Sequence, residues 1–248
     1  MVAVDRAVVL AAGKGTRLGS LTAQVPKPLV SVGGRPLLDH ILSGLVAAGA
    51  RSFAIITGYL EDAVHDFISQ WSDRNVPRES LFVECVSQGD MLGTGHALLQ
   101  LPSWWRTAPT IVAFGDILVA DEEYVRLREV AAERAGTSVM AVATVDDPCE
   151  GAAVYVDATG LVTRLVEKPP RGTSTTKFIN VGLFSFLPEL FPILEEIQPS
   201  ARGEIELTSA LDVLAGRRRL AALPLARAFI DIGTPERLAL ANDWAASR

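Results

Sequence analysis

A glycine-rich loop with nearby cations is the segment of this sequence most suited to chemistry. The apolar run over 7–12 ends in Gly13-Lys14-Gly15-Thr16-Arg17-Leu18, and Lys27 follows between Pro26 and Pro28. Glycines directly after a strand let backbone N–H groups approach a phosphate closely. Cations around a phosphate-sized hole suit a triphosphate better than a dinucleotide, so the loop is predicted to bind a triphosphate.

Two common phosphate-binding motifs do not fit this loop. A Walker A loop has Ser or Thr after Gly-Lys, where this sequence has Gly15. The dinucleotide fingerprint places its third glycine where Leu18 stands, and here that glycine comes only at Gly19. The bland alternative is a solvated turn that carries ordinary surface cations.

Two aspartates each follow a short apolar run. Asp116 comes after the run 110–114 and one glycine, and Asp231 directly follows 228–230. Both would lie just beyond the carboxyl end of a strand, where open α/β sheets bind ligands. Taken singly, each aspartate could equally cap a helix or form a turn, and the sequence does not show that the two meet in space.

Strand and helix patterns alternate along the first half of the chain and must position these residues. The spacing predicts strands over 7–12, 52–57, 81–86 and 110–114, and helices over 36–48, 60–71, 94–101 and 122–134. Such alternation predicts an α/β fold with a doubly wound, mostly parallel, Rossmann-like sheet and helices on both faces.

After residue 137 the pattern changes to strands separated by turns. Strands are expected over 138–145, 152–156, 161–167 and 178–186, and helices over 188–197, over 205–214 and from Pro235 onwards. We therefore expect residues 1–248 to form one domain with a first lobe over about 1–135 and a smaller, β-containing lobe over about 136–248.

The composition excludes several classes of protein. Against 23 Lys and Arg stand 29 Asp and Glu, a net charge of −6, which argues against a nucleic-acid partner. Cys85 and Cys149 are too few for a disulfide framework. No run of apolar residues is long enough to span a membrane and no signal peptide is evident, so a cytoplasmic protein without a membrane partner is expected. The sequence leaves open whether the chain forms a homo-oligomer.

Several short motifs occur in one order along nearly the whole chain. They are the loop 13–18 with Pro26-Lys27-Pro28, then Leu92-Gly93-Thr94-Gly95-His96-Ala97, Phe114-Gly115-Asp116, Glu167-Lys168-Pro169, Asn180-x-Gly182 and Asp231-x-Gly233-Thr234. Together they resemble the signature of the sugar-1-phosphate nucleotidyltransferases, and most closely the uridylyl and thymidylyl branch. The resemblance implies an enzyme that joins a nucleoside triphosphate to a sugar-1-phosphate, releases pyrophosphate and makes a nucleotide-sugar.

The same resemblance implies roles for individual residues. Arg17, Lys27 and Asp116 would be catalytic, and Asp116 and Asp231 would hold Mg²⁺, which needs only one or two protein carboxylates. The nucleotide would be bound by Leu10, Ala11, Ala12, Gly13, Gly15, Thr16, Gln88, Gly93 and Thr94. The sugar phosphate would be bound in the second lobe by Gly151, Glu167, Lys168, Asn180 and Gly182.

Gln88 carries the prediction about the base. A glutamine amide has one acceptor and two donors, so it can pair with the adjacent N–H and carbonyl of uracil or thymine. The resembled uridylyl- and thymidylyltransferases carry a glutamine at this spacing before Gly93. We therefore expect UTP or dTTP as the donor, ahead of GTP, CTP and ATP. The alternative is a polar loop residue without this role.

Three departures and three rivals accompany the resemblance. Ser209 and Phe229 stand where the family often has Asp and Trp, which bears on the choice of sugar. No hexapeptide-repeat tail follows, so a fused acetyltransferase domain is not expected. The rivals are a nucleotidyltransferase for a cyclitol, choline or heptose-like phosphate, a catalytically inactive nucleotide-sensing subunit, and a dinucleotide-dependent oxidoreductase.

Overall fold

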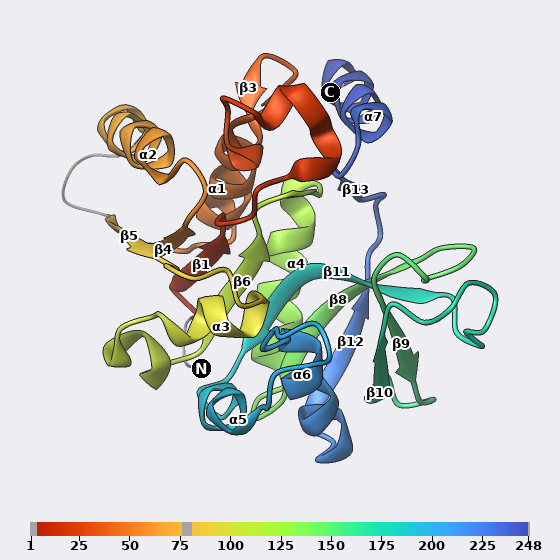
Figure 1. Cartoon of the computed structure of the whole chain (residues 1–248). Helices are drawn as coiled ribbons and strands as arrows, with labels where there is room; N and C mark the ends of the chain where they lie inside the picture. The colour runs from red at the N-terminus through yellow and green to blue at the C-terminus, as the bar shows by residue number, and fades with distance from the viewer. Residues whose placement is uncertain (1–3, 76–80, 248) are drawn as a thin grey trace.

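A computed structural model describes residues 4–75 and 81–247 and contains a central parallel sheet (Figure 1). Its parallel part has the order β6-β1-β4-β5. These strands are β1 (Arg6–Leu10), β4 (Ser52–Thr57), β5 (Phe82–Ser87) and β6 (Thr110–Phe114). The helices between and after them are α1 (Leu37–Ala47), α2 (Glu61–Asn75), α3 (Thr94–Leu99) and α4 (Asp121–Glu133).

The sheet continues into the second half of the chain through antiparallel strands. Within the described part of the chain it has nine strands, ordered β10-β9-β11-β6-β1-β4-β5, with β8 paired to β11 and β12. The added strands are β8 (Ser138–Thr144), β9 (Ala152–Val156), β10 (Val162–Glu167), β11 (Phe178–Phe186) and β12 (Leu220–Pro224). Because β11 pairs with both β6 and β8, one sheet supports both halves of the site.

Both faces of the sheet are buried at the central strands β1, β4 and β6, which explains why these strands are apolar without alternation. Ala7 and Val9 of β1 pack in a core with α1, α2 and α4, whereas Val8 packs with α3, α5 and α6 on the opposite face. The latter two helices are α5 (Leu190–Glu196) and α6 (Leu207–Gly216). Successive side chains of a strand point to opposite faces, so each β1 residue contributes to one of two cores.

Short elements complete the fold. Three 3₁₀ helices span Thr16–Thr22, Lys27–Leu29 and Ser103–Thr107, and α7 spans Pro235–Ala246. Two small antiparallel pairs join β2 (Ser31–Val32) to β3 (Arg35–Pro36) and β7 (Ile117–Leu118) to β13 (Ile230–Asp231). The second pair brings the segments after Phe114 and before Ile232 side by side.

The predicted fold class is confirmed, and several strand bounds agree with the sequence pattern. The first strand ends at Leu10 rather than residue 12, because the chain turns there into the glycine loop, although the Ala11 N–H still donates to the Ile56 carbonyl at 2.8 Å. The strand β12 and the pairing within the two small pairs were not predicted. A strand over 228–230 that ends before Asp231 was expected, whereas the structure has the two-residue strand β13, which includes Asp231. Among the described residues, no helix has both the length and the apolar character needed to cross a membrane.

Candidate functional site

The glycine loop leaves β1 beside the end of β6 and folds back over Lys27. Leu10 pairs with Phe114 in the sheet, and the Gly115 N–H donates to the Leu10 carbonyl at 2.9 Å. Gly15 has φ of 63°, and a Cβ there would lie 2.9 Å from the Cβ of Lys27. Glycine is therefore required both by the left-handed backbone and by the close approach.

Lys27 is the centre of a charge cluster at the carboxyl edge of the sheet. Its side chain is almost fully buried, and its Nζ lies 2.7 Å from Oδ2 of Asp116 and 3.8 Å from Oδ1 of Asp231. Arg17 approaches from the glycine loop, with its Nη2 3.9 Å from Oδ2 of Asp231. Gly233 makes room for that guanidinium, because a Cβ there would lie 2.9 Å from Nη2 of Arg17. The predicted catalytic cations and carboxylates thus converge.

The two aspartates fit a cation between them. Oδ1 of Asp231 is buried and accepts no hydrogen bond. Burial, together with the neighbouring Asp116 carboxylate, raises the pKa of Asp231 above its ordinary value, despite the opposing effect of Lys27. A buried carboxylate oxygen without a donor, beside a second carboxylate, is a favourable ligand pair for a hard divalent cation.

One cavity of about 330 Å³ lies over the carboxyl ends of β1 and β6. Its lining includes most of the residues predicted to bind the nucleotide, namely Leu10, Ala11, Ala12, Gly13, Gln88, Gly93 and Thr94, together with Lys27 and Asp116. Gly15, Thr16 and Arg17 lie outside this lining. Thr16 is exposed at the start of its 3₁₀ helix, so its predicted contact with nucleotide is not formed by this cavity.

Gln88 lies buried in the wall of this cavity. Its Nε2 donates to the Gly93 carbonyl at 3.0 Å and lies 3.4 Å from Nδ1 of His96. Gly93 has φ of 102°, and a Cβ there would lie 2.7 Å from the Ile205 carbonyl oxygen, so only glycine fits this close backbone contact. The Ile205 N–H donates in turn to the Leu92 carbonyl at 2.7 Å. The segment predicted to bind the base is therefore held by a loop from the second half of the chain.

A second cavity of about 530 Å³ continues from the first over β9, β10 and β11. Four of the residues predicted to bind the sugar phosphate, Gly151, Glu167, Lys168 and Asn180, line it, whereas Gly182 does not. Lys168 has φ of 42°, a strained value for a residue other than glycine and one that clusters at functional sites. Its N–H donates to the Gly151 carbonyl at 3.0 Å, which fixes the turn after β10.

Gly182 does not line this cavity, but it contacts two residues that do, Asn180 and Phe114. It has φ of 83°, lies where the register of β11 shifts, and faces Phe114, whose ring would lie 2.4 Å from an added Cβ. Its N–H donates to Oδ1 of Asn180 at 2.9 Å, so the bulge orients the Asn180 amide. The predicted binding role of Gly182 is therefore better described as support for Asn180 and Phe114.

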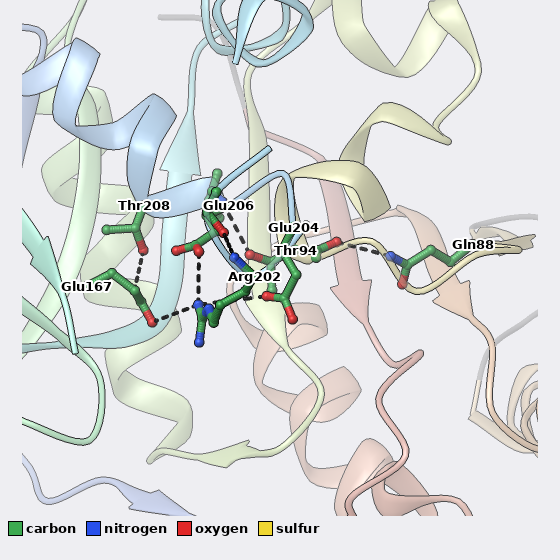
Figure 2. Close-up of polar contacts among 10 residues, drawn as sticks. Gln88, Thr94, Glu167, Arg202, Glu204, Glu206 and Thr208 are labelled. Carbon is green, nitrogen blue, oxygen red and sulfur yellow. Dashed lines mark hydrogen bonds and ion pairs between the residues drawn. The ribbon is translucent and has the colours of Figure 1, made fainter. Parts of the chain in front are cut away.

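An arginine that the sequence analysis missed lines the larger cavity. Figure 2 shows Arg202 among three glutamates, with its Nη2 3.0 Å from Glu206, 3.7 Å from Glu204 and 3.8 Å from Glu167. Thr208 donates to the other oxygen of Glu167 at 2.8 Å. A loop arginine carries no periodic signal, so only its nearness to the Glu204 to Thr208 segment of the sequence could have pointed to it.

Of the residues that the structure describes, four line both cavities, and they define where two ligands would meet. These residues are Thr94, Phe114, Asp116 and Glu204. Lys27 lines the first cavity and Asp231 the second, on either side of Asp116. The charge cluster therefore lies at the junction, where a group could pass from one bound molecule to another.

Comparison with known proteins defines the class of this chain. Residues 6–247 match the nucleotidyl transferase family, so the chain belongs to that family and the resemblance found in the sequence is confirmed. The UTP–glucose-1-phosphate uridylyltransferase AglF of Haloferax volcanii is 31% identical over 236 residues, which cover 93% of this chain and 92% of AglF. The bifunctional protein GlmU of Methanococcus maripaludis is 30% identical over 237 residues, which cover 96% of this chain. The chain spans 53% of that GlmU protein, about half its length.

Solved structures share the fold. A UDP-glucose pyrophosphorylase complexed with UDP-glucose superimposes with a TM-score of 0.88 at 23% identity, covering 99% of this chain and 100% of that chain. A putative glucose-1-phosphate thymidylyltransferase from Bacillus anthracis gives a TM-score of 0.84 at 24% identity, covering 98% and 96% respectively.

Proposed function

We propose that this chain is a sugar-1-phosphate nucleotidyltransferase that uses UTP or dTTP. The observation that carries the proposal is the place of the charge cluster, in which Lys27 and two carboxylates lie where the two cavities join. The smaller cavity would hold the nucleoside triphosphate, and the larger one the sugar phosphate. The names of the related AglF protein and of the UDP-glucose-bound structure agree with these two substrates.

In the proposed reaction, a phosphate oxygen of the sugar-1-phosphate attacks the α-phosphorus of the triphosphate. A new P–O bond forms, and the bond to the bridging oxygen of the leaving pyrophosphate breaks, with its electron pair going to pyrophosphate. No proton must be removed from an ionised phosphate oxygen, so the protein mainly positions the reactants and neutralises charge. Lys27 and Arg17 would compensate negative charge on the triphosphate, and Lys168 that on the sugar phosphate.

Asp116 and Asp231 would hold the Mg²⁺ ion that the family resemblance implies. The two carboxylates fit this ion, because the buried Oδ1 of Asp231 accepts no hydrogen bond and is therefore available as a ligand. When bound, the ion would supply positive charge to phosphate oxygens. The two carboxylates contribute its binding and orientation at the junction of the cavities.

The orientation of Gln88 supports a pyrimidine with an imide edge. A backbone carbonyl can only accept a hydrogen bond, so the contact with Gly93 places Nε2 on that side and leaves Oε1 as an acceptor for a ligand. Uracil and thymine present a ring N–H between two carbonyls. Cytosine and adenine present an unprotonated ring nitrogen instead, which would face Oε1 without a hydrogen.

The proposed reaction is tested by measuring pyrophosphate release with each of the five triphosphates against a panel of sugar-1-phosphates, cyclitol phosphate and phosphocholine, with Mg²⁺. Turnover should require both substrates and should reverse with a nucleotide-sugar and pyrophosphate. Nucleotide binding without turnover in either direction would instead favour a nucleotide-sensing subunit. Cytoplasmic location and any oligomeric state stay predictions from the sequence.

The base is tested by comparing kcat/KM for the five triphosphates in the wild type and in Gln88→Ala. We expect the preference for UTP or dTTP over ATP to fall by about 10-fold or more, because a base edge then loses its partner. Gln100→Ala is the matched control, because Gln100 contacts His96 at 3.1 Å but does not line the cavity. Unchanged selectivity in Gln88→Ala would remove this assignment and leave the reaction class untouched.

A further inference from the structure

Glu123 is a fully buried acidic side chain outside both cavities. Its side chain has 0% exposure, and its Oε1 accepts hydrogen bonds from the Ala226 N–H at 2.9 Å and the Arg227 N–H at 2.8 Å. Its Oε2 pairs with Nη1 of Arg126 at 2.5 Å. Burying a carboxylate is costly unless it is paired and hydrogen-bonded, so this residue is held in one place by several partners.

The backbone that Glu123 binds leads to Asp231. The chain leaves β12 at Pro224, passes Ala226 and Arg227, and enters β13, which ends at Asp231. Arg126 reaches the same segment, with its Nη2 3.4 Å from the Pro224 carbonyl. Glu123 and Arg126 of α4 therefore hold the segment that leads to Asp231, the second candidate metal ligand.

The same helix follows the first candidate ligand. Asp116 precedes β7, and α4 begins shortly after β7 ends. In the β7–β13 pair Asp231 lies opposite Ile117, and the Ile232 N–H donates to the Asp116 carbonyl at 2.9 Å. Glu123 thus closes a ring that runs from Asp116 through α4, across to residue 226, and along β13 back to Asp116.

We propose that Glu123 is a positioning residue that sets the Asp231 carboxylate against Asp116 for metal binding, an inference that rests on the proposed metal site. The β7–β13 pair has only two residues on each strand, which is too short to define the approach of β13 alone. Glu123 supplies the second anchor, because its buried Oε1 accepts hydrogen bonds from two backbone N–H groups of the exposed segment after β12. The role of the Glu123 carboxylate is therefore to fix the position of Asp231 relative to Asp116.

The test measures Mn²⁺ binding to the full chain in the absence of nucleotide. Binding is monitored by EPR, as the decrease in the signal of free Mn²⁺. Glu123→Ala should weaken Mn²⁺ binding on the order of 10-fold, the lower end of the range for outer-shell partners of a metal. Glu123→Gln should restore it to within about 2-fold, because the amide oxygen can accept the same two N–H groups. In steady-state assays the alanine variant should need more Mg²⁺ for half-maximal rate, while KM for the sugar phosphate stays unchanged.

Asp157→Ala is the matched control. Its Oδ1 also accepts two backbone N–H groups, those of Thr159 at 2.8 Å and Leu161 at 3.1 Å, but in the hairpin turn between β9 and β10. It should lower thermal stability without changing Mn²⁺ affinity. If Glu123→Ala does not fold, Glu123→Asp is the second variant, because its shorter side chain cannot reach both donors and should weaken Mn²⁺ binding in a folded protein.

Asp231→Asn separates the two levels of the proposal. Wild type that binds no Mn²⁺, or Asp231→Asn that binds it as tightly as wild type, would overturn the metal site and the role of Glu123 with it. Mn²⁺ binding that Asp231→Asn weakens, but that folded Glu123 variants retain in full, would overturn the positioning role alone. A Glu123→Gln variant as weak as Glu123→Ala would likewise overturn it, because the backbone hydrogen bonds would not be the cause.

Discussion

Replacing Lys27 with alanine removes the cation at the centre of the charge cluster. The Nζ of this lysine lies 2.7 Å from Asp116, and only 8% of its side chain is exposed. Because the stem is buried against Gly15, alanine leaves a space beside the two carboxylates, and Arg17, with its Nη2 3.9 Å from Asp231, stays as a neighbouring cation. The variant therefore tests the role of one charge at a defined position.

The size of the effect follows from electrostatics. Two unit charges 4 Å apart attract by about 4 kcal/mol at the effective dielectric constant of about 20 that suits sites near a protein surface. Only the part of that attraction that grows as the pyrophosphate leaves lowers the barrier. Loss of one such group typically costs about 10²–10³ in kcat, or about 2.7–4 kcal/mol. We therefore expect Lys27→Ala to lower kcat by about 10²-fold or more.

Metal affinity should change in the opposite direction. Lys27 competes with a metal for the carboxylates of Asp116 and Asp231, so its removal should leave Mn²⁺ binding as strong or stronger. Lys14→Ala is the matched control, because this lysine lies exposed in the same glycine loop and should lower kcat by no more than a few-fold. The measurements are kcat, KM for both substrates, and Mn²⁺ binding by EPR.

Near-normal kcat in folded Lys27→Ala would refute this reasoning, because the buried cation would then serve only to neutralise the aspartates. Loss of Mn²⁺ binding together with activity would also refute it. In that case Lys27 would support the geometry of the carboxylates rather than act on the triphosphate.

Three further predictions concern neighbouring residues. Asp231→Asn should abolish most activity yet raise the thermal stability of the metal-free protein at neutral pH. The pKa of Asp231 is raised in the folded protein, so the ionised carboxylate destabilises the fold increasingly as pH rises from about 3.8 through the higher folded pKa. The gain in stability from the asparagine should therefore shrink at acidic pH. Thermal melts without metal at both pH values check this, and an equal gain at both contradicts it. Lys168→Ala should raise KM for the sugar phosphate with little change in KM for the triphosphate, and the reverse pattern would remove its assignment. Gly182→Ala should lower the free energy of unfolding by about 1–3 kcal/mol, because it adds a Cβ against Phe114 at positive φ, and an unchanged denaturation midpoint would contradict that account.

The parallel half of the fold could be predicted because three of its strands, β1, β4 and β6, are buried on both faces. Apolar runs such as Thr110–Phe114 stand out against the helices beside them, and the bounds of β4 and β6 match the sequence pattern, whereas β1 and β5 differ from it by one or two residues. The pair β7–β13 could not be predicted, because two residues have no periodicity. It is this pair that brings Asp116 and Asp231 together, so the sequence identified both residues without showing that they meet.

Residues that act through loops or backbone were also missed. Arg202 gives no pattern along the chain, since its partners Glu167 and Glu206 come from a strand end and the start of α6. Glu123 looks like an ordinary acidic residue in the first turn of a helix, where carboxylates favour the dipole. Its burial depends on the turn after β12, a strand that the sequence analysis did not predict.

The ion pairs of the charge cluster also bear on how the site would bind two ligands of opposite charge, a triphosphate and a divalent metal ion. Asp116 and Asp231 are close enough to repel each other, and Lys27 and Arg17 partly neutralise them. A triphosphate would attract these two cations, and a divalent metal would take their place beside the carboxylates. Each ligand thus removes a competitor of the other, so metal and triphosphate should bind with positive coupling, and by linkage each should strengthen the other by the same factor.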